Sequence, residues 1–387
     1  MIPLIRNTFL NEQETKQSLA DFIITADKLS MGDKCLAFEK SFAMFQGRQD
    51  AVLVNSGGSA NLALLQSLKN LGRIKDGDNI GFSSITWATN VMPIIQLGMT
   101  PVAVDCSLST LNVMSGNLLD RLRDVDLKVM FITNVLGFTG DLDNIRCICK
   151  SLKIILIEDS CESLGTMLPC AQCGNFGMAS TFSFFVAHHL STIEGGMVCT
   201  DDEELAEMLR MVRANGWDRN LTNRQQARWR QKFNVTSEFQ AKYVFYDLGY
   251  NLRPTEITGY LGLLQLPYLL SAIKARERNY IETEKAMNTD ELFIIDHSHV
   301  TQLSSFAIPV ICKTPSIKKK YLLRFEESNI ETRPIIAGNI QKQPFYRKYV
   351  SQLYNLSDTA FIHENGFYCG NYPEMTEDDI NVIKNVL

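Results

Sequence analysis

Phe182 to Gly196 reads FSFFVAHHLSTIEGG, an aromatic, apolar run followed by two adjacent histidines and then Glu-Gly-Gly. The run is typical of a buried strand, and the glycines are typical of a tight turn. His188 and His189 lie between these two features, in a chain that has only five His. The residues alone leave two interpretations open. The pair can serve a functional site, or one His can be satisfied in the core while the other lies at the surface.

Upstream of this stretch, short apolar runs alternate with helical patterns. We expect strands over 51–54, 79–82, 101–104, 129–133, 154–157 and, beyond the stretch, 197–200, with helices over 62–71, 118–122 and 142–152 among others. Such alternation predicts an α/β fold with a mainly parallel sheet that is covered on both faces. Ligands of such sheets bind beyond the carboxyl ends of the strands.

Two polar segments follow expected strands and therefore fall at that edge. Residues 55–61, NSGGSAN, form a Gly/Ser turn before a helix, which aims free backbone N–H groups at an anion such as phosphate. Asp159 follows the strand over 154–157. Each segment also has a plain structural interpretation, because such turns are common connectors and an acid at a strand end can cap the next helix.

Length and composition limit the class of protein. The chain has 387 residues, more than one core usually spans, so we expect two domains, over 1–255 and 256–387. A net charge of −5 argues against a general nucleic-acid or anionic-membrane binder. The first residues turn polar too soon for a signal peptide, and no apolar run has membrane-spanning length. We therefore expect a cytoplasmic protein without a membrane partner.

The ten Cys are scattered and are expected to be free thiols. Cys170 and Cys173 have the spacing of a metal or redox pair, but no second matched pair follows them. We therefore expect no metal site.

The motifs together resemble those of the sugar-nucleotide aminotransferases of the DegT/DnrJ/EryC1/StrS family. The resemblance covers almost the whole chain and rests on five separated motifs in the family's order, among them residues 55–61, 158–159 and 249–256. It implies the aspartate-aminotransferase fold, which is fold type I of the pyridoxal-phosphate enzymes. In that fold a large domain with a mainly parallel sheet of the seven-stranded type is followed by a smaller C-terminal α/β domain.

The resemblance also implies a set of site residues. The Gly/Ser turn and Ser183 would hold the cofactor phosphate, Trp87 would stack on the pyridine ring, and Asp159 would pair with its protonated nitrogen. Asn251 would reach across a homodimer interface to the neighbouring subunit's cofactor. The cofactor set is Gly57, Gly58, Ser59, Trp87, Asp159, Glu162, Ser183 and Asn251, and the substrate set is Arg219, Arg333 and Asn339.

The sequence departs from the family at one decisive position. Where the family has the Lys that forms a Schiff base with the cofactor, this chain has His188, and His189 is expected to point elsewhere. An imidazole cannot form an imine with an aldehyde, but it can move protons near neutral pH. The resemblance is then to the sugar 3-dehydratases in which His replaces Lys, with His188 as the base and pyridoxamine 5'-phosphate as the resting form of pyridoxal 5'-phosphate.

That branch implies a substrate and an amino donor. An NDP-4-keto-6-deoxyhexose, GDP-linked if the nearest resemblance is to the colitose branch, would lose its C3 hydroxyl. L-glutamate would then regenerate the amine form of the cofactor. The product would serve dideoxysugar biosynthesis for a surface polysaccharide.

Three alternatives stay open beside this interpretation. The chain could be an ordinary NDP-sugar aminotransferase, although imine exchange needs an amine side chain. It could be an iron–sulfur CDP-hexose 3-dehydratase, although only Cys199, Cys312 and Cys369 follow His188 and four thiolates hold a cluster. It could also be an inactive sugar-nucleotide-binding regulator, although such a protein would not need a retained phosphate cradle.

Overall fold

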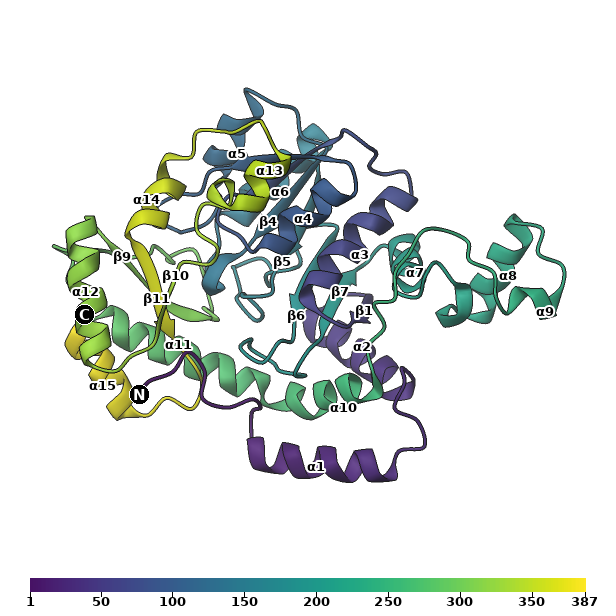
Figure 1. Ribbon diagram of the computed structural model, residues 1–387, viewed down its shortest axis with the longest axis horizontal. Coiled ribbons are helices and arrows are strands. Elements are labelled where there is room, and N and C mark those ends of the chain that lie inside the picture. The colour runs from purple at the N-terminus through teal and green to yellow at the C-terminus, as the bar shows by residue number, and fades with distance from the viewer.

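The computed structural model describes residues 1–387 as an α/β protein with two sheets (Figure 1). The larger sheet has seven strands in the order β1-β7-β6-β5-β4-β2-β3. β7 alone runs against the others, so the sheet is mainly parallel, as the sequence predicts. The strands are β1 (Asp50–Val54), β2 (Asn79–Ser83), β3 (Thr100–Val104), β4 (Val129–Thr133), β5 (Ile155–Asp159), β6 (Ala179–Ser183) and β7 (Gly196–Thr200).

Helices cover both faces of this sheet. Its central strands are buried along their whole length, and successive residues point to opposite faces. Val129 and Phe131 of β4 accordingly join one hydrophobic cluster, whereas Met130 and Ile132 join another. The covering helices are α2 (Asp33–Gln46), α3 (Gly57–Asn70), α4 (Ala88–Gln96), α5 (Ser115–Leu122), α6 (Leu142–Leu152) and α7 (Glu203–Val212).

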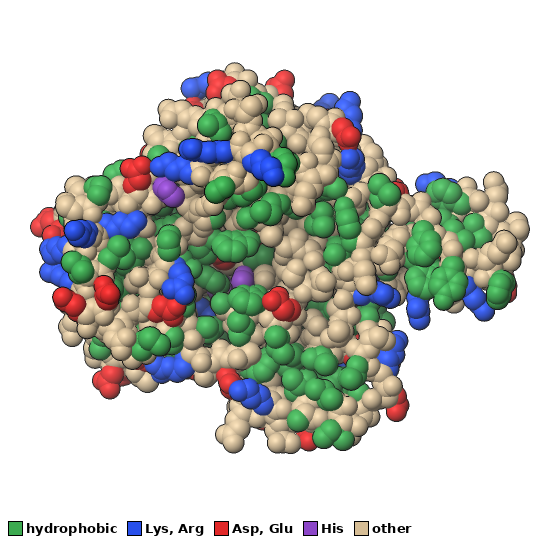
Figure 2. Space-filling view, in the orientation of Figure 1, with side chains coloured by type: hydrophobic (Ala, Val, Ile, Leu, Met, Phe, Trp, Pro, Cys, Tyr) green, Lys and Arg blue, Asp and Glu red, His purple; other side chains and the backbone are tan.

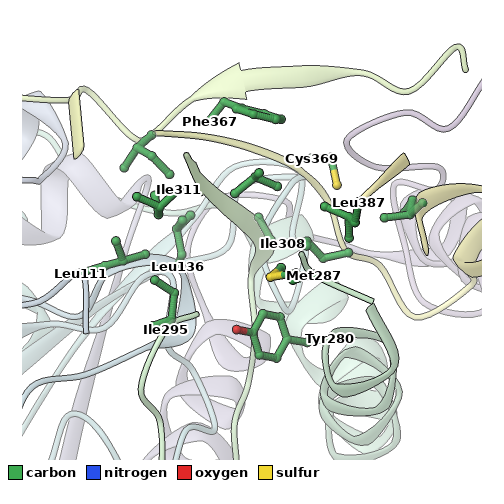
Figure 3. Packing of buried hydrophobic residues seen from close by; sticks show 14 of the residues in the cluster. Leu111, Leu136, Tyr280, Met287, Ile295, Ile308, Ile311, Phe367, Cys369 and Leu387 are labelled. Carbon is green, nitrogen blue, oxygen red and sulfur yellow. The ribbon is translucent and has the colours of Figure 1, made fainter. Parts of the chain in front are cut away.

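The second sheet has four strands in the order β10-β11-β9-β8 and its own core. Figure 3 shows part of that core, in which Tyr280 and Ile308 approach Met287. The strands are β8 (Leu292–Phe293), β9 (Ala307–Cys312), β10 (Thr332–Pro334) and β11 (Gly366–Gly370). The helices that pack with this sheet are α11 (Leu269–Glu284), α12 (Pro315–Glu327), α14 (Ser357–Asn365) and α15 (Glu377–Val386). This part of the chain also contains α10 (Glu256–Gln265), which packs against α2, and η3 (Leu266–Tyr268), η4 (Ile340–Lys342) and α13 (Pro344–Tyr349).

The first residues of the chain pack with this second sheet. Ile2 forms a parallel bridge with Ile330 and belongs to the same hydrophobic core. The two termini accordingly lie on the same side of the molecule in Figure 1. The domain boundary between residues 255 and 256 stays a prediction.

Residues 222–242 are polar and show no regular apolar pattern in the sequence. They form α8 (Asn223–Lys232) and α9 (Glu238–Ala241), which project from the body of the molecule (Figure 1). A capping box between Thr222 and Gln225 starts α8 and is its local sequence signal. The remaining elements are α1 (Glu12–Thr25), η1 (Val135–Gly137) and η2 (Asp218–Asn220), and no helix combines the length and apolar character needed to cross a membrane.

Candidate active site

A cavity of ≈ 670 Å³ lies between the large sheet and the second sheet. Thr133, Asp159 and Ser183 line it, and these are the last residues of β4, β5 and β6. The cavity therefore lies beyond the carboxyl edge of the sheet, where the strand pattern predicts a ligand. Residues from 306 to 368 form its other wall. Figure 2 shows a hollow near the centre of this face of the molecule.

The stretch from Phe182 to Gly196 forms the floor of this cavity. β6 ends at Ser183, the chain passes through the two histidines, and β7 returns antiparallel from Gly196. β7 also pairs with β1, which leads into the Gly/Ser turn. Gly196 is required there because a Cβ atom would lie 2.2 Å from the Ser56 carbonyl oxygen. The Glu-Gly-Gly sequence thus brings the turn at 55–61 beside Ser183.

The turn forms the N-terminus of α3 and faces the cavity. Ser56 caps the helix, because its hydroxyl accepts the Ser59 N–H at 3.1 Å, and Gly57 and Gly58 line the cavity. A Cβ atom on Gly57 would lie 2.6 Å from Ser183 Cβ, so only glycine allows this approach. The first backbone N–H groups of a helix have no partner within it and carry partial positive charge. A phosphate fits this cradle. Ser59 itself does not line the cavity.

Asp159 is a buried carboxylate without a cationic partner. Its side chain is 4% exposed. Oδ2 accepts from Asn61 Nδ2 at 3.1 Å and from Asn90 Nδ2 at 2.6 Å, and Oδ1 accepts from the Cys161 N–H at 2.9 Å. These three N–H donors orient the carboxylate, and no cationic side chain forms an ion pair with it. A protonated pyridine nitrogen is the kind of group that this carboxylate can pair with.

His188 lies in an irregular turn after β6, and no Lys lines the cavity. The rings of Phe306 and Phe185 lie edge-on to the imidazole, at centroid distances of 5.3 and 6.1 Å. Burial lowers the pKa of His188 to about 4, and the positive charge of Arg276 adds to this effect. His188 is therefore neutral at pH 7 and can accept a proton.

Glu162 also lines the cavity but has the opposite protonation. Its Oε2 accepts the Leu136 N–H at 2.8 Å. Burial, with a smaller contribution from the charge of Asp159, raises the pKa of Glu162 to about 8. At neutral pH Glu162 is therefore protonated and is a hydrogen-bond donor in the cavity that the neutral His188 imidazole also lines.

Two more predicted residues line the cavity. Trp87 is the N-cap residue of α4 and leaves 58% of its surface exposed, so its indole is available to a flat ring. Arg333 projects from β10 and forms an ion pair with Glu331 at 2.6 Å.

Three predicted residues besides Ser59 lie outside the cavity. Arg219 stacks its guanidinium over the Trp217 ring at 5.1 Å. Asn251 is exposed and accepts from Arg253 Nε at 3.0 Å. Asn339 is buried, and its side chain accepts the Gln341 N–H at 3.0 Å as the cap of η4. The expected roles of these three residues stay predictions.

The cavity also contains residues that the sequence did not indicate. They include Thr86, Thr133, Cys161, Phe306, His363 and Tyr368, and Asn61 and Asn90 donate to Asp159 from outside the cavity. The register of β10 and β11 would have indicated Tyr368, because Tyr368 pairs with Arg333 across these strands and side chains at paired positions lie on the same face of the sheet. These strands are short and irregular in sequence, so their register could not be derived.

The comparisons with known proteins agree with this geometry. The family model of the DegT/DnrJ/EryC1/StrS aminotransferases matches residues 11–387. A GDP-4-keto-6-deoxy-D-mannose 3-dehydratase of Escherichia coli O55:H7 is 32% identical over 374 residues, which are 94% of either chain. A solved E. coli GDP-4-keto-6-deoxy-D-mannose-3-dehydratase with bound hydrated PLP has a TM-score of 0.90 at 31% identity, and the match covers 100% of this chain and 99% of that one.

A further solved structure is relevant to the amino donor. It is a GDP-4-keto-6-deoxymannose-3-dehydratase with a trapped PLP-glutamate geminal diamine, and it matches with a TM-score of 0.91 at 30% identity over 100% of both chains. The expected fold type I of pyridoxal-phosphate enzymes is confirmed by these full-length matches.

Proposed function

This chain belongs to the DegT/DnrJ/EryC1/StrS aminotransferase family, and from that premise we propose that it is a pyridoxal/pyridoxamine-phosphate-dependent sugar-nucleotide 3-dehydratase. It removes the C3 hydroxyl of an NDP-4-keto-6-deoxyhexose, which is GDP-linked as in the relative's name. The observation that carries the proposal is a cavity built for a B6 cofactor in which His188 is present and no Lys lines the wall. The product serves dideoxysugar biosynthesis for a surface polysaccharide.

The residues on the large-sheet side of the cavity hold the cofactor. The α3 N-terminus at Gly57 and Gly58, together with Ser183, binds the phosphate, and Asp159 pairs with the ring nitrogen. Trp87 covers the ring. When bound, the cofactor supplies an amino group for the substrate ketone and an electron sink that lets the hydroxyl leave.

His188 moves the proton of the reaction, and Glu162 supplies a hydrogen-bond donor. The neutral imidazole of His188 accepts a proton, and its cation then donates that proton to the departing hydroxyl, which leaves as water. Glu162 is protonated at neutral pH and donates a hydrogen bond into the cavity. Arg333 binds the anionic part of the sugar nucleotide at the cavity's other wall.

A second copy of the chain completes the site in this proposal. Asn251 is exposed and lies outside its own cavity, and Arg219 also lies outside it. A homodimer would bring Asn251 to the neighbouring subunit's cofactor phosphate. L-glutamate returns the cofactor to its amine form, as the trapped glutamate adduct of the similar enzyme suggests. The cytoplasmic location expected from the sequence stays a prediction.

The ordinary aminotransferase is the nearest alternative. It is disfavoured because rapid exchange of imines needs an amine side chain in the cavity, and an imidazole offers none. The iron–sulfur dehydratase would need reducing equivalents from a reductase and iron in the purified protein.

The test has two stages. Purified protein with pyridoxal phosphate and L-glutamate should form pyridoxamine phosphate and 2-oxoglutarate. The protein in its amine form should then remove one water from GDP-4-keto-6-deoxymannose, as followed by mass spectrometry. Other NDP-4-keto-6-deoxy sugars serve as the comparison panel. Formation of a 4-amino sugar without loss of water would identify an aminotransferase, and a requirement for iron and a reductase would identify the cluster-dependent branch.

A further inference from the structure

His188, the base of the proposed reaction, has few interactions that orient its imidazole ring. His188 lies in a turn without regular structure, and its backbone N–H donates to the Phe185 carbonyl at 2.8 Å. Its Nδ1 atom is buried and has no hydrogen-bond partner. A proton-transfer group must be held in a defined direction to be effective, so another group has to fix this turn.

The adjacent histidine is fixed more firmly. His189 is 2% exposed, and its Nε2 lies 3.0 Å from the Ser304 carbonyl oxygen. A carbonyl oxygen can only accept, so Nε2 carries the proton and Nδ1 does not. Nδ1 is buried without a donor, which agrees with a neutral ring in that single tautomer. The bond connects the turn after β6 to the opposite wall of the cavity.

The acceptor at the other end of this bond is immobile. The Ser304 N–H donates to Thr166 Oγ1 at 3.1 Å, and the Ser304 hydroxyl donates to the Leu164 carbonyl at 2.7 Å. The Ser304 carbonyl also packs against Gly137, where a Cβ atom would lie 2.1 Å from the carbonyl oxygen. Ser304 is therefore held from three sides before His189 binds to it.

The same strip of chain contacts His188 as well. The Phe306 ring lies 5.3 Å from the His188 ring and 6.0 Å from the His189 ring, centroid to centroid. The Phe306 carbonyl accepts from Arg276 Nη1 at 3.0 Å, and the same nitrogen donates to the Asn371 carbonyl. Residues 304–306 thus form a segment that is anchored by its own hydrogen bonds and that contacts both imidazoles.

We infer that His189 is a positioning residue, which aims the His188 imidazole into the cavity through its hydrogen bond to the Ser304 carbonyl. One peptide bond separates the two residues, so the direction of His188 follows from that of its neighbour. The proposed chemistry of His188 is the premise of this inference. It explains why the chain has two adjacent histidines although only one of them lines the cavity.

The competing interpretation is that His189 only fills space in the core. Leu190 is fully buried and could anchor the turn by packing alone. The two interpretations differ in what a shorter or longer donor does. The amide nitrogen of Gln reaches approximately the position of Nε2, whereas that of Asn reaches the position of Nδ1 and falls short of Ser304.

The experiment compares His189→Gln with His189→Asn in the full-length protein. We expect His189→Asn to lower kcat by roughly 10- to 100-fold with little change in KM, because misplacement of a reacting group has effects of this size. His189→Gln should recover most of the wild-type kcat. His297→Gln is the matched control, because His297 binds Glu284 outside the cavity and should leave kcat unchanged.

A second measurement does not depend on activity. Nitrogen-15 NMR of the ring nitrogens of the five histidines, in protein without cofactor, reports the tautomer of His189 and the titration of His188. We expect a proton on Nε2 of His189, and a His188 pKa that rises toward its ordinary value in His189→Asn but not in His189→Gln. A core residue without a positioning role would lower the unfolding temperature of both variants and leave the His188 titration unchanged, which would overturn the inference. A wild-type protein without dehydratase activity would refute the proposed function, and the NMR result would still decide the positioning role.

Discussion

The two walls of the cavity are built in different ways. The wall from the large sheet consists of strand ends whose polar groups already have partners, such as Asp159 with three N–H donors. The wall from the second sheet presents Arg333, which is paired with Glu331, and the Tyr368 hydroxyl, which forms no hydrogen bond within the protein. The first wall is preorganised for one constant ligand, as a cofactor is. The second wall leaves the Tyr368 hydroxyl free for a substrate, so the two walls should respond differently to mutation.

The largest difference between the walls should come from their histidines. We expect His188→Asn to lower kcat for dehydration roughly 10²- to 10⁴-fold, because it removes the group that accepts and returns the proton. Cofactor binding should persist, because Asp159 and the α3 N-terminus are unchanged. His363→Asn, on the second wall, is the matched control and should alter KM more than kcat. Rapid-quench measurement of product and retention of cofactor after gel filtration give the two readouts. Equal loss of kcat in both variants would show that the two walls do not differ in their roles in catalysis and substrate binding.

The role of the α3 N-terminus in binding the cofactor phosphate can be tested by adding a single methyl group to Gly57. Gly57→Ala would place a Cβ atom 2.6 Å from Ser183 Cβ, at the start of α3. Overpacking of this kind costs about 1–3 kcal/mol, which is about a 5- to 150-fold rise in the Kd of the cofactor phosphate if the cradle shifts to relieve it. Gly116→Ala is the control, because its Cβ would meet open space within α5. Titration of the protein with pyridoxamine phosphate measures both Kd values, and equal values would show that the turn does not hold the phosphate.

His188 is neutral and Glu162 is protonated at neutral pH, which predicts that kcat is high only between two pH limits. The pKa of His188 is lowered to about 4, so the rate should stay level as the pH falls from 7 and decline as His188 becomes protonated near pH 4. The pKa of Glu162 is raised to about 8, so its donor is lost as the pH rises through 8. A pH profile of kcat checks both limbs. An acid limb near 6.5, the ordinary value for His, would show that His188 is not shielded from solvent.

The same groups affect stability with opposite signs. His188 has a lowered pKa, so its neutral form contributes stability above pH 6.5 that is lost as the pH falls through about 4. Glu162 has a raised pKa, so its contribution is present below its unfolded pKa and is lost as the pH rises through about 8. The urea midpoint of His188→Asn should therefore depend less on pH between 4 and 6.5 than that of the wild type.

The difference between the walls also separates what the sequence could predict from what it could not. Gly57, Asp159 and Ser183 lie at the ends of regular strands, and strand periodicity and turn chemistry are local signals that place such residues at one edge. The second wall depends on the register of β10 and β11, on η4 and on a positive-φ pair at Ala337 and Gly338. Those features are set by packing between segments far apart in the chain. The expectation therefore found Arg333 and overlooked Tyr368, which lies directly opposite it.

The smallest expected effect tests whether the second wall contacts the substrate. Tyr368→Phe removes a hydroxyl that has no protein partner, so folding should be unaffected. If that hydroxyl binds the sugar nucleotide, its loss should cost about 0.5–1.5 kcal/mol, about a 2- to 12-fold rise in KM, with kcat nearly unchanged. Tyr346→Phe is the matched control, because the Tyr346 hydroxyl is buried without a partner outside the cavity. Burial raises the pKa of Tyr368 to about 12, so the phenol remains a donor throughout the pH range of the assay. An unchanged KM in Tyr368→Phe would mean that the substrate lies toward Trp87, and the free hydroxyl of Tyr368 would then need another explanation.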